Sequence, residues 1–241
     1  MEVRDDAPDR VAPDMPEPAS FLTRLIDIHL APERALRVVA AFPRTWWQPT
    51  LFLIILGAVA IYLTMDRLIV PEMINSMVEQ GLSDEQIDDS LPVMKFIPWA
   101  ALILVPLQIL VIALVAHLCA NLLLGGVGAY LGAVSVVAHS LLIGVVEALV
   151  RVPLMLAKES LEVYLGPALL LPADMQETLL FRVIAQFDIF TIWKVLLIGL
   201  GLAIVYRLAP RRAIAMMVVL WLIWVLATAL LGGLAPGGAG V

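Results

Sequence analysis

Five long apolar runs dominate the pattern of hydrophobic and polar positions along this chain of 241 residues. A helix rises about 1.5 Å per residue, so each run is long enough to cross a hydrocarbon core of about 30 Å. Backbone amides in lipid must be hydrogen-bonded within the chain, and runs of this length therefore predict helices rather than barrel strands. We predict an all-α integral membrane protein, a five-transmembrane-helix bundle with spans near residues 48–65, 98–124, 131–156, 189–208 and 213–234.

The composition agrees with this class of protein. Of all residues, 62% are hydrophobic and 15% are charged, against about 25% charged in soluble proteins. One membrane domain over residues 45–234 is predicted, between an acidic, proline-rich tail at 1–19, expected to be disordered, and a short glycine-rich tail at 235–241. The net charge of −6 argues against nucleic-acid binding, which needs a basic patch.

Two amphipathic segments are predicted outside the spans. In residues 20–44, Ser20 can cap one short helix and Pro32 can open a second, with basic residues between the apolar ones. This segment is either an interfacial anchor or a helix packed on the cytoplasmic face of the bundle. Residues 174–187 show a second amphipathic pattern, which we expect along the outer membrane surface before the fourth span.

The link between the first two spans, residues 66–95, is acidic. Ser83 and Gln86 form a capping-box pattern, which predicts a short helix that ends before Pro92. The acidic residues could attract cations or a basic partner, but a solvated loop face is the favoured interpretation.

The distribution of basic residues predicts the orientation. Lys and Arg near the ends of spans collect on the cytoplasmic side of membrane proteins. Arginines precede the first span and fill the link between the fourth and fifth spans, whereas the other links are longer and more acidic. We expect a cytoplasmic N-terminus and an external C-terminus.

Polar and ionisable side chains inside spans are costly in lipid, so each is a candidate functional residue or a member of a structural pair. Their spacing places two on one face of the second span and three close to one stripe of the third, while two more flank the start of the fourth: His117, Asn121, His139, Glu147, Arg151, Asp188 and Lys194. The functional hypothesis is a proton or cation relay through His139 and Glu147, with Arg151 holding Glu147 ionised. The favoured interpretation is structural, a Glu147–Arg151 pair and hydrogen bonds between helices.

Asp188 and Lys194 lie six positions apart and do not share a helix face. We expect each to meet a partner on another span or to reach the interface. The single cysteine, Cys119, cannot form an internal disulfide, and no ligand spacing predicts a metal site. No nucleophile with a base and no phosphate loop is present, so no catalytic, cofactor-binding or metal residue is assigned.

Small residues predict close approaches of helices. Gly125, Gly126 and Gly128 permit a tight turn between the second and third spans, and Gly199 with Gly201 lets the fourth span approach a neighbour. Packing within the chain is favoured over a dimer interface.

The order of several residues resembles the Yip domain family of membrane proteins, named for interaction with Ypt/Rab GTPases. The resemblance covers about residues 20–232 and rests on an amphipathic segment followed by motifs at the start of the first and fourth spans: Pro32, Trp46, Trp47, Pro49, Phe187, Asp188, Phe190 and Trp193. It implies a five-span bundle that binds other proteins and lacks known catalytic residues. Eukaryotic members work in vesicle traffic, and some bacterial members look like companions of ABC-type exporters. The tail of about 20 residues before the amphipathic segment departs from the eukaryotic pattern, which argues against a Rab-binding role.

The predicted function follows from these observations. We expect a non-enzymatic membrane protein that contacts the lipid bilayer and organises or modulates another membrane protein, an exporter complex or trafficking machinery, through its cytoplasmic helix and the helix beginning at Asp188. It can also form a homo-oligomer. Twelve Arg against three Lys favour a bacterial inner membrane. The alternative is a small transporter or channel that uses the polar residues of the second and third spans; an intramembrane enzyme would need a reactive group.

Overall fold

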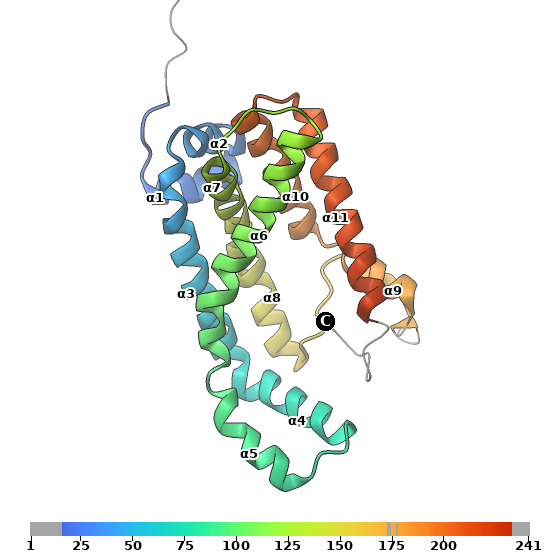
Figure 1. Cartoon of the computed structure of the whole chain (residues 1–241). Coiled ribbons are helices and arrows are strands. Elements are labelled where there is room, and N and C mark those ends of the chain that lie inside the picture. The colour runs from blue at the N-terminus through green and yellow to red at the C-terminus, as the bar shows by residue number, and fades with distance from the viewer. Residues whose placement is uncertain (1–15, 173–174, 177, 233–241) are drawn as a thin grey trace, which may run out of the picture.

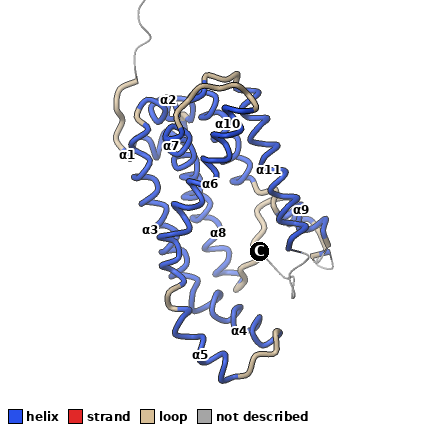
Figure 2. The backbone as a smooth tube through the Cα atoms, viewed as in Figure 1, coloured by secondary structure: helices blue, strands red, loops and turns tan. Residues whose placement is uncertain are grey.

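The computed structural model describes residues 16–172, 175–176 and 178–232, and these residues form helices and connecting loops without a strand (Figures 1 and 2). Both predicted tails fall outside the described residues, except for 16–19. Five helical segments are long and apolar enough to span a membrane: 43–79, 97–122, 130–158, 189–206 and 210–231. The predicted fold class, an all-α bundle of five membrane-spanning segments, is confirmed.

The main helices of these segments are α3 (Trp47–Thr64), α6 (Ala101–Leu122), α7 (Tyr130–Ser140) with α8 (Gly144–Lys158), α10 (Ile189–Tyr206) and α11 (Pro210–Gly232). The second segment begins with a 3-10 turn, η3 (Ile97–Ala100). The third segment was expected to be one continuous helix from 131 to 156, but a 3-10 turn, η4 (Leu141–Ile143), separates α7 from α8. A 3-10 turn changes the number of residues per turn, so the faces of α7 and α8 are no longer in one register.

The helix of the first span does not stop near residue 65, where the predicted span ends. The helix continues through a π-helical turn, η2 (Met65–Ile69), into α4 (Val70–Glu79). After a turn at Gly81, which has a positive φ of 80°, α5 (Asp84–Met94) begins with the predicted capping box of Ser83 and Gln86. Pro92 lies inside α5 rather than beyond it. Proline removes one hydrogen bond to the carbonyl four residues earlier, and that residue, Asp88, is exposed to solvent, which can satisfy it.

We call α4, α5 and the turn between them the arm. The arm extends beyond the end of the bundle, on the side opposite α1 and α2 (Figure 1). No residue of α4 is buried, and only Ile87 and Met94 of α5 are buried. The arm therefore shares little of the hydrophobic core of the bundle.

The amphipathic segment before the first span forms two short helices, α1 (Phe21–Leu30) and α2 (Pro32–Ala41). The predicted cap is present, because Ser20 Oγ accepts a hydrogen bond of 3.1 Å from the Thr23 amide. Ile28, Leu36 and Val39 are fully buried in a hydrophobic cluster with residues of α7 and α10. The packed alternative is thus correct for one face of the segment. The opposite face of α1 carries an exposed apolar stripe, Leu22, Ile26 and Leu30.

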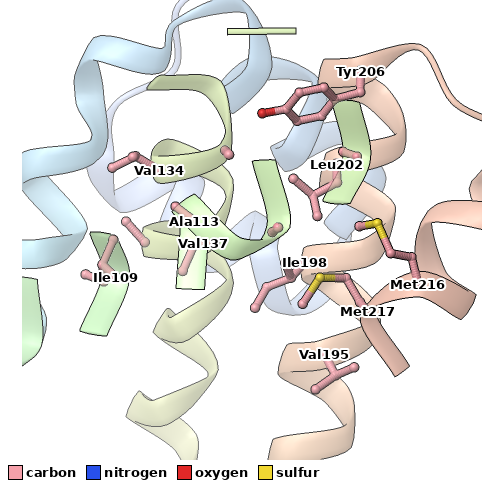
Figure 3. Packing of buried hydrophobic residues seen from close by; sticks show 14 residues of the cluster. Ile109, Ala113, Val134, Val137, Val195, Ile198, Leu202, Tyr206, Met216 and Met217 are labelled. Carbon is pink, nitrogen blue, oxygen red and sulfur yellow. The ribbon is translucent and has the colours of Figure 1, made fainter. Parts of the chain in front are cut away.

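The largest hydrophobic cluster joins α6, α7, α10 and α11 (Figure 3). Alanines on α6 and α7 let these helices pack closely, and longer side chains fill the space toward α10 and α11; Figure 3 labels Val134, Ile198, Leu202, Met216 and Met217 among them. Without a hydrophobic driving force between helices in lipid, this close packing of small and large side chains is the main attraction that holds the spans together.

Glycines set the closest helix contacts, as the sequence predicts. A Cβ at Gly199 would lie 2.7 Å from Cα of Ile214 on α11, and a Cβ at Gly201 would overlap Val136 on α7. Tyr206 packs in the same way on Gly126 and Gly128 in the turn before α7. Gly199 and Gly201 are therefore used within the chain, which was the favoured interpretation.

We expect Gly199→Ala to lower the free energy of unfolding by about 1–3 kcal/mol, because the new methyl group meets backbone atoms of α11 that cannot rotate away. The measurement is denaturation in mixed detergent micelles. Gly57→Ala on α3 is the matched control, since nothing lies within 4 Å of a Cβ at that position. Equal stability of the two variants would contradict the predicted close packing.

Candidate functional site

Four charged side chains at the junction of α8 and α10 form one network, which we call the charge cluster. Lys194 Nζ lies 2.7 Å from Glu147 Oε2, and Arg151 Nη2 lies 3.0 Å from Glu147 Oε1. Arg151 also forms an ion pair with Asp188. Two cations and two anions make the charge cluster formally neutral, which lowers the cost of placing charges in lipid.

Asp188 has a second role as the N-cap of α10. Its Oδ1 accepts a hydrogen bond of 2.6 Å from the Phe190 amide and one of 3.4 Å from the Thr191 amide. Its side chain is only 9% exposed, so it faces its own chain. The expectation that Asp188 and Lys194 meet partners on another span is confirmed, and both partners are on α8. The partner contact expected through the helix that begins at Asp188 stays a prediction.

The start of α10 lies level with the middle of α11. The Phe187 ring packs against Trp221, with centroids 4.9 Å apart. Trp221 is 11 residues from either end of α11, and so α11 continues for about 16 Å beyond it. The charge cluster, next to Phe187, is therefore well inside the helical bundle.

The segment that leads into α10 enters the bundle with an irregular backbone. Non-helical backbone at membrane depth needs partners within the protein. Arg151 Nη1 donates a hydrogen bond of 2.8 Å to the carbonyl of buried Val163, and Gly166 lies directly against the Phe187 carbonyl. A short helix, α9 (Leu179–Ala185), then packs against α11. It is shorter than the amphipathic pattern at 174–187, whose first residue, Asp174, lies outside the described residues.

A second polar group, the Arg24 cluster, joins α1, α3 and α7. Arg24 Nη1 lies 2.9 Å from His139 Nε2, and Arg24 Nη2 donates to Gln48 Oε1. His139 Nδ1 lies 2.8 Å from the Ser135 carbonyl, which can only accept. The proton is therefore assigned to Nδ1, and Nε2 of a neutral His139 accepts from Arg24.

These contacts correct the predicted stripe of His139, Glu147 and Arg151. The hydrogen bonds of His139 go to α1 and α7, while Glu147 and Arg151 bond to each other, to α10 and to the segment before it. The 3-10 turn between α7 and α8 separates the two groups. No hydrogen bond between described residues links His139 to Glu147, and so the two exchange groups of the relay hypothesis are not brought together.

A third polar group lies between α6 and the end of α10. His117 Nδ1 is 2.5 Å from the Tyr206 hydroxyl, and Asn121 Nδ2 is 3.1 Å from the same ring nitrogen. The expected hydrogen bond between spans at His117 is therefore present. The sequence patterns did not identify Tyr206, Arg24 or Gln48. The only sequence signal for these three residues is a polar side chain next to an apolar helix face. Such side chains are common at the ends of spans, so this signal does not distinguish them.

The residues that carry the family resemblance have mainly structural positions. Pro32 is the first residue of α2, Pro49 is buried and Trp46 packs against the main core cluster. Phe190 is buried, and Trp193 packs edge-on against His29 of α1. Trp47 is 54% exposed.

The chemistry available to these groups is ion pairing and hydrogen bonding between helices. Each ionisable member of the three polar groups has a partner within the chain. Among the described residues, no three His, Cys, Asp or Glu side chains gather in a way that could hold a metal ion.

The fold and its polar groups define a multi-span integral membrane protein whose helices contact lipid and are tied together by small residues and paired charges. The model of the Yip1 domain matches residues 26–231, nearly the whole chain, and the protein belongs to this family. The resemblance found from the sequence motifs is confirmed. No curated protein and no solved structure is significantly similar to the chain.

Proposed function

We propose that this Yip1-domain protein organises or modulates a second membrane protein and catalyses no reaction. The observation that carries the proposal is the arm, which extends from the bundle and contributes little to its packing (Figure 1). Members of the family are not known as enzymes. The partner that we propose belongs to an exporter complex or to membrane-trafficking machinery.

The surface of the arm combines acidic and apolar groups. Val93 and Phe96, at its end and just beyond it, are each 68% exposed. Six acidic side chains are exposed on it: Glu72, Glu79, Asp84, Glu85, Asp88 and Asp89. Opposite charges steer association and apolar contacts supply affinity, so this surface suits a partner with basic and apolar residues near the membrane.

The charge cluster supports this function over transport. A relay needs groups that can exchange protons or ions, whereas Glu147 is held by both Arg151 and Lys194, and Asp188 by Arg151 and two backbone amides. These contacts favour a structural tie between α8 and α10.

The proposed membrane is the bacterial inner membrane, with the α1–α2 side in the cytoplasm. Six exposed arginines on that side support this orientation through the positive-inside rule: Arg34, Arg37, Arg44, Arg207, Arg211 and Arg212. The arm is then external.

Site-specific photo-crosslinking in cells tests the proposal. A photoreactive amino acid at Val93 or Phe96 is expected to capture one membrane protein in stoichiometric amounts. The same amino acid at Leu107, an exposed residue of α6 within the second span, is the matched control and is expected to capture none. Asp88→Lys with Asp89→Lys should weaken capture from Phe96. Equal capture at Leu107, or capture of only a second copy of this chain, would contradict the proposal.

A further inference from the structure

Arg24 is a buried cation surrounded by neutral groups. The residue is 3% exposed, and its hydrogen bonds go to His139, Gln48 and the Ser20 carbonyl. Asp27 lies one turn further along α1, but its Oδ1 pairs with Arg34 at 2.5 Å. Among the described residues, no carboxylate forms an ion pair with Arg24. Burial lowers the pKa of Arg24, yet a guanidinium stays protonated in proteins. An uncompensated buried charge is costly, and so an anionic partner is expected.

Arg24 is one of the residues that line a small hollow. Its volume is about 80 Å³, and it is lined by the chain that precedes α1 and by α2 with the turn that follows it: Pro18, Ala19, Arg24, Val38, Phe42 and Thr45. A guanidinium carries five N–H groups in a planar fork. Three contacts occupy one hydrogen each on the three nitrogens of Arg24, and two N–H groups are left to bind an oxyanion. The volume suits a single tetrahedral oxyanion group and excludes a large organic ligand.

The hollow lies next to residues typical of the membrane interface. Gln48, which accepts from Arg24, directly follows the exposed Trp47 at the start of α3. The 3-10 turn before α3, η1 (Pro43–Trp46), carries the exposed Arg44. Tryptophan and arginine at the start of a span mark the depth of lipid headgroups. Thr45 of the same turn lines the hollow, which places the hollow near this depth.

We propose that Arg24 is the centre of a phosphate-binding site, occupied by the headgroup phosphate of an anionic phospholipid or by inorganic phosphate. Charge-assisted hydrogen bonds between a guanidinium and a phosphate are about twice as strong as those between neutral groups. His139, held in its Nδ1–H tautomer by Ser135, positions Arg24 by accepting from Nη1. The site lies outside the partner surface of the arm and does not depend on the proposed function.

Native mass spectrometry of the full chain in detergent, titrated with phosphatidylglycerol, tests the proposal. Arg24→Gln is expected to raise the dissociation constant of the first lipid by about tenfold or more, because it removes one charge-assisted contact. Arg37→Gln is the matched control, because this arginine is exposed on α2 and pairs only with Glu33 at the surface. Ala19→Leu keeps Arg24 and fills the hollow, and it is expected to weaken binding as Arg24→Gln does, even if Arg24→Gln folds poorly.

Competition distinguishes the two sources of the phosphate, a lipid headgroup and the free anion. The lipid titrations are repeated with phosphatidylcholine and in the presence of millimolar inorganic phosphate. If phosphate displaces the lipid and the two lipids bind equally, the site binds the free anion. If phosphatidylglycerol binds more tightly than phosphatidylcholine, the site binds the lipid headgroup. Lipid and phosphate binding unchanged in both Arg24→Gln and Ala19→Leu would overturn the proposal. So would binding gained only after removal of residues 1–15, since the acidic tail of the chain would then be the natural occupant.

Discussion

Replacing Asp188 by alanine is expected to lower the free energy of unfolding by about 3–5 kcal/mol, the usual cost of breaking a buried ion pair. The variant leaves Arg151 and Lys194 to share one carboxylate, Glu147, so that the charge cluster becomes positive inside the bundle. It also removes the acceptor for the Phe190 and Thr191 amides at the start of α10. Both effects loosen the tie between α8 and α10.

Chemical denaturation in mixed micelles measures this loss. Asp188→Asn keeps a capping oxygen and removes the charge, and it should recover only the capping part, about 1 kcal/mol. Glu33→Ala is the control, because Glu33 also pairs with an arginine, Arg37, but on an exposed surface, where the cost stays below about 1 kcal/mol. Equal losses for Asp188→Ala and Glu33→Ala would show that the charge cluster does not hold the bundle together.

Gly166→Ala is the second substitution with a large expected effect, about 3 kcal/mol or more. A Cβ at this position would overlap the carbonyl oxygen of Phe187, which is a backbone atom and cannot be moved by a change of rotamer. The entering segment would have to move away from the start of α10. The Phe187–Trp221 contact and the Arg151–Val163 hydrogen bond would be disturbed with it.

Thermal denaturation in detergent, followed by tryptophan fluorescence, measures the effect of this substitution. Gly144→Ala is the control, because nothing lies within 4 Å of a Cβ there and alanine in place of a helical glycine stabilises by up to about 1 kcal/mol. A Gly166→Ala variant as stable as Gly144→Ala would rule out the close packing of the entering segment on α10.

The charge cluster explains how α8 is held in the bundle. No residue of α8 is buried, although α7, the other part of the same span, is buried along most of its length. Packing of α8 comes from its contacts with α3 and from half-buried side chains such as Val146. The ion pairs to Asp188 and Lys194 add to that packing, which makes a structural role for Glu147 and Arg151 the simplest account of their place in a span.

The sequence predicts the features that depend on local pattern. The length of each apolar run fixes the five spans, and the caps at Ser20 and Ser83 locate two helix starts, because these signals lie within a few neighbouring residues. Glu147 and Arg151 are separated by one helical turn, and so their pairing is also readable from the sequence.

Features that depend on contacts between distant segments were missed. Lys194 and Glu147 are 47 positions apart, and Arg24 and His139 are 115 apart. Each residue stands out in the sequence, but its partner depends on how the helices pack. The stripe through His139 and Glu147 assumed an unbroken helix, and the 3-10 turn between α7 and α8 breaks its period. The continuation of α3 into α4 was missed because the polar pair Asp66 and Arg67 resembles a loop.

The central claim is that the charges inside the membrane domain are structural pairs, costly only when one partner is left alone, and that function depends on the external surface. The most direct test is the double substitution Glu147→Gln with Lys194→Met, which removes one anion and one cation and leaves the Arg151–Asp188 pair. The free energy of unfolding of this variant is expected to lie within about 1 kcal/mol of that of the natural protein. Partner capture from Phe96 should be complete, and proton flux in proteoliposomes should equal that of the natural protein. A stable variant that loses partner capture, or that loses a proton flux present in the natural protein, would contradict the claim.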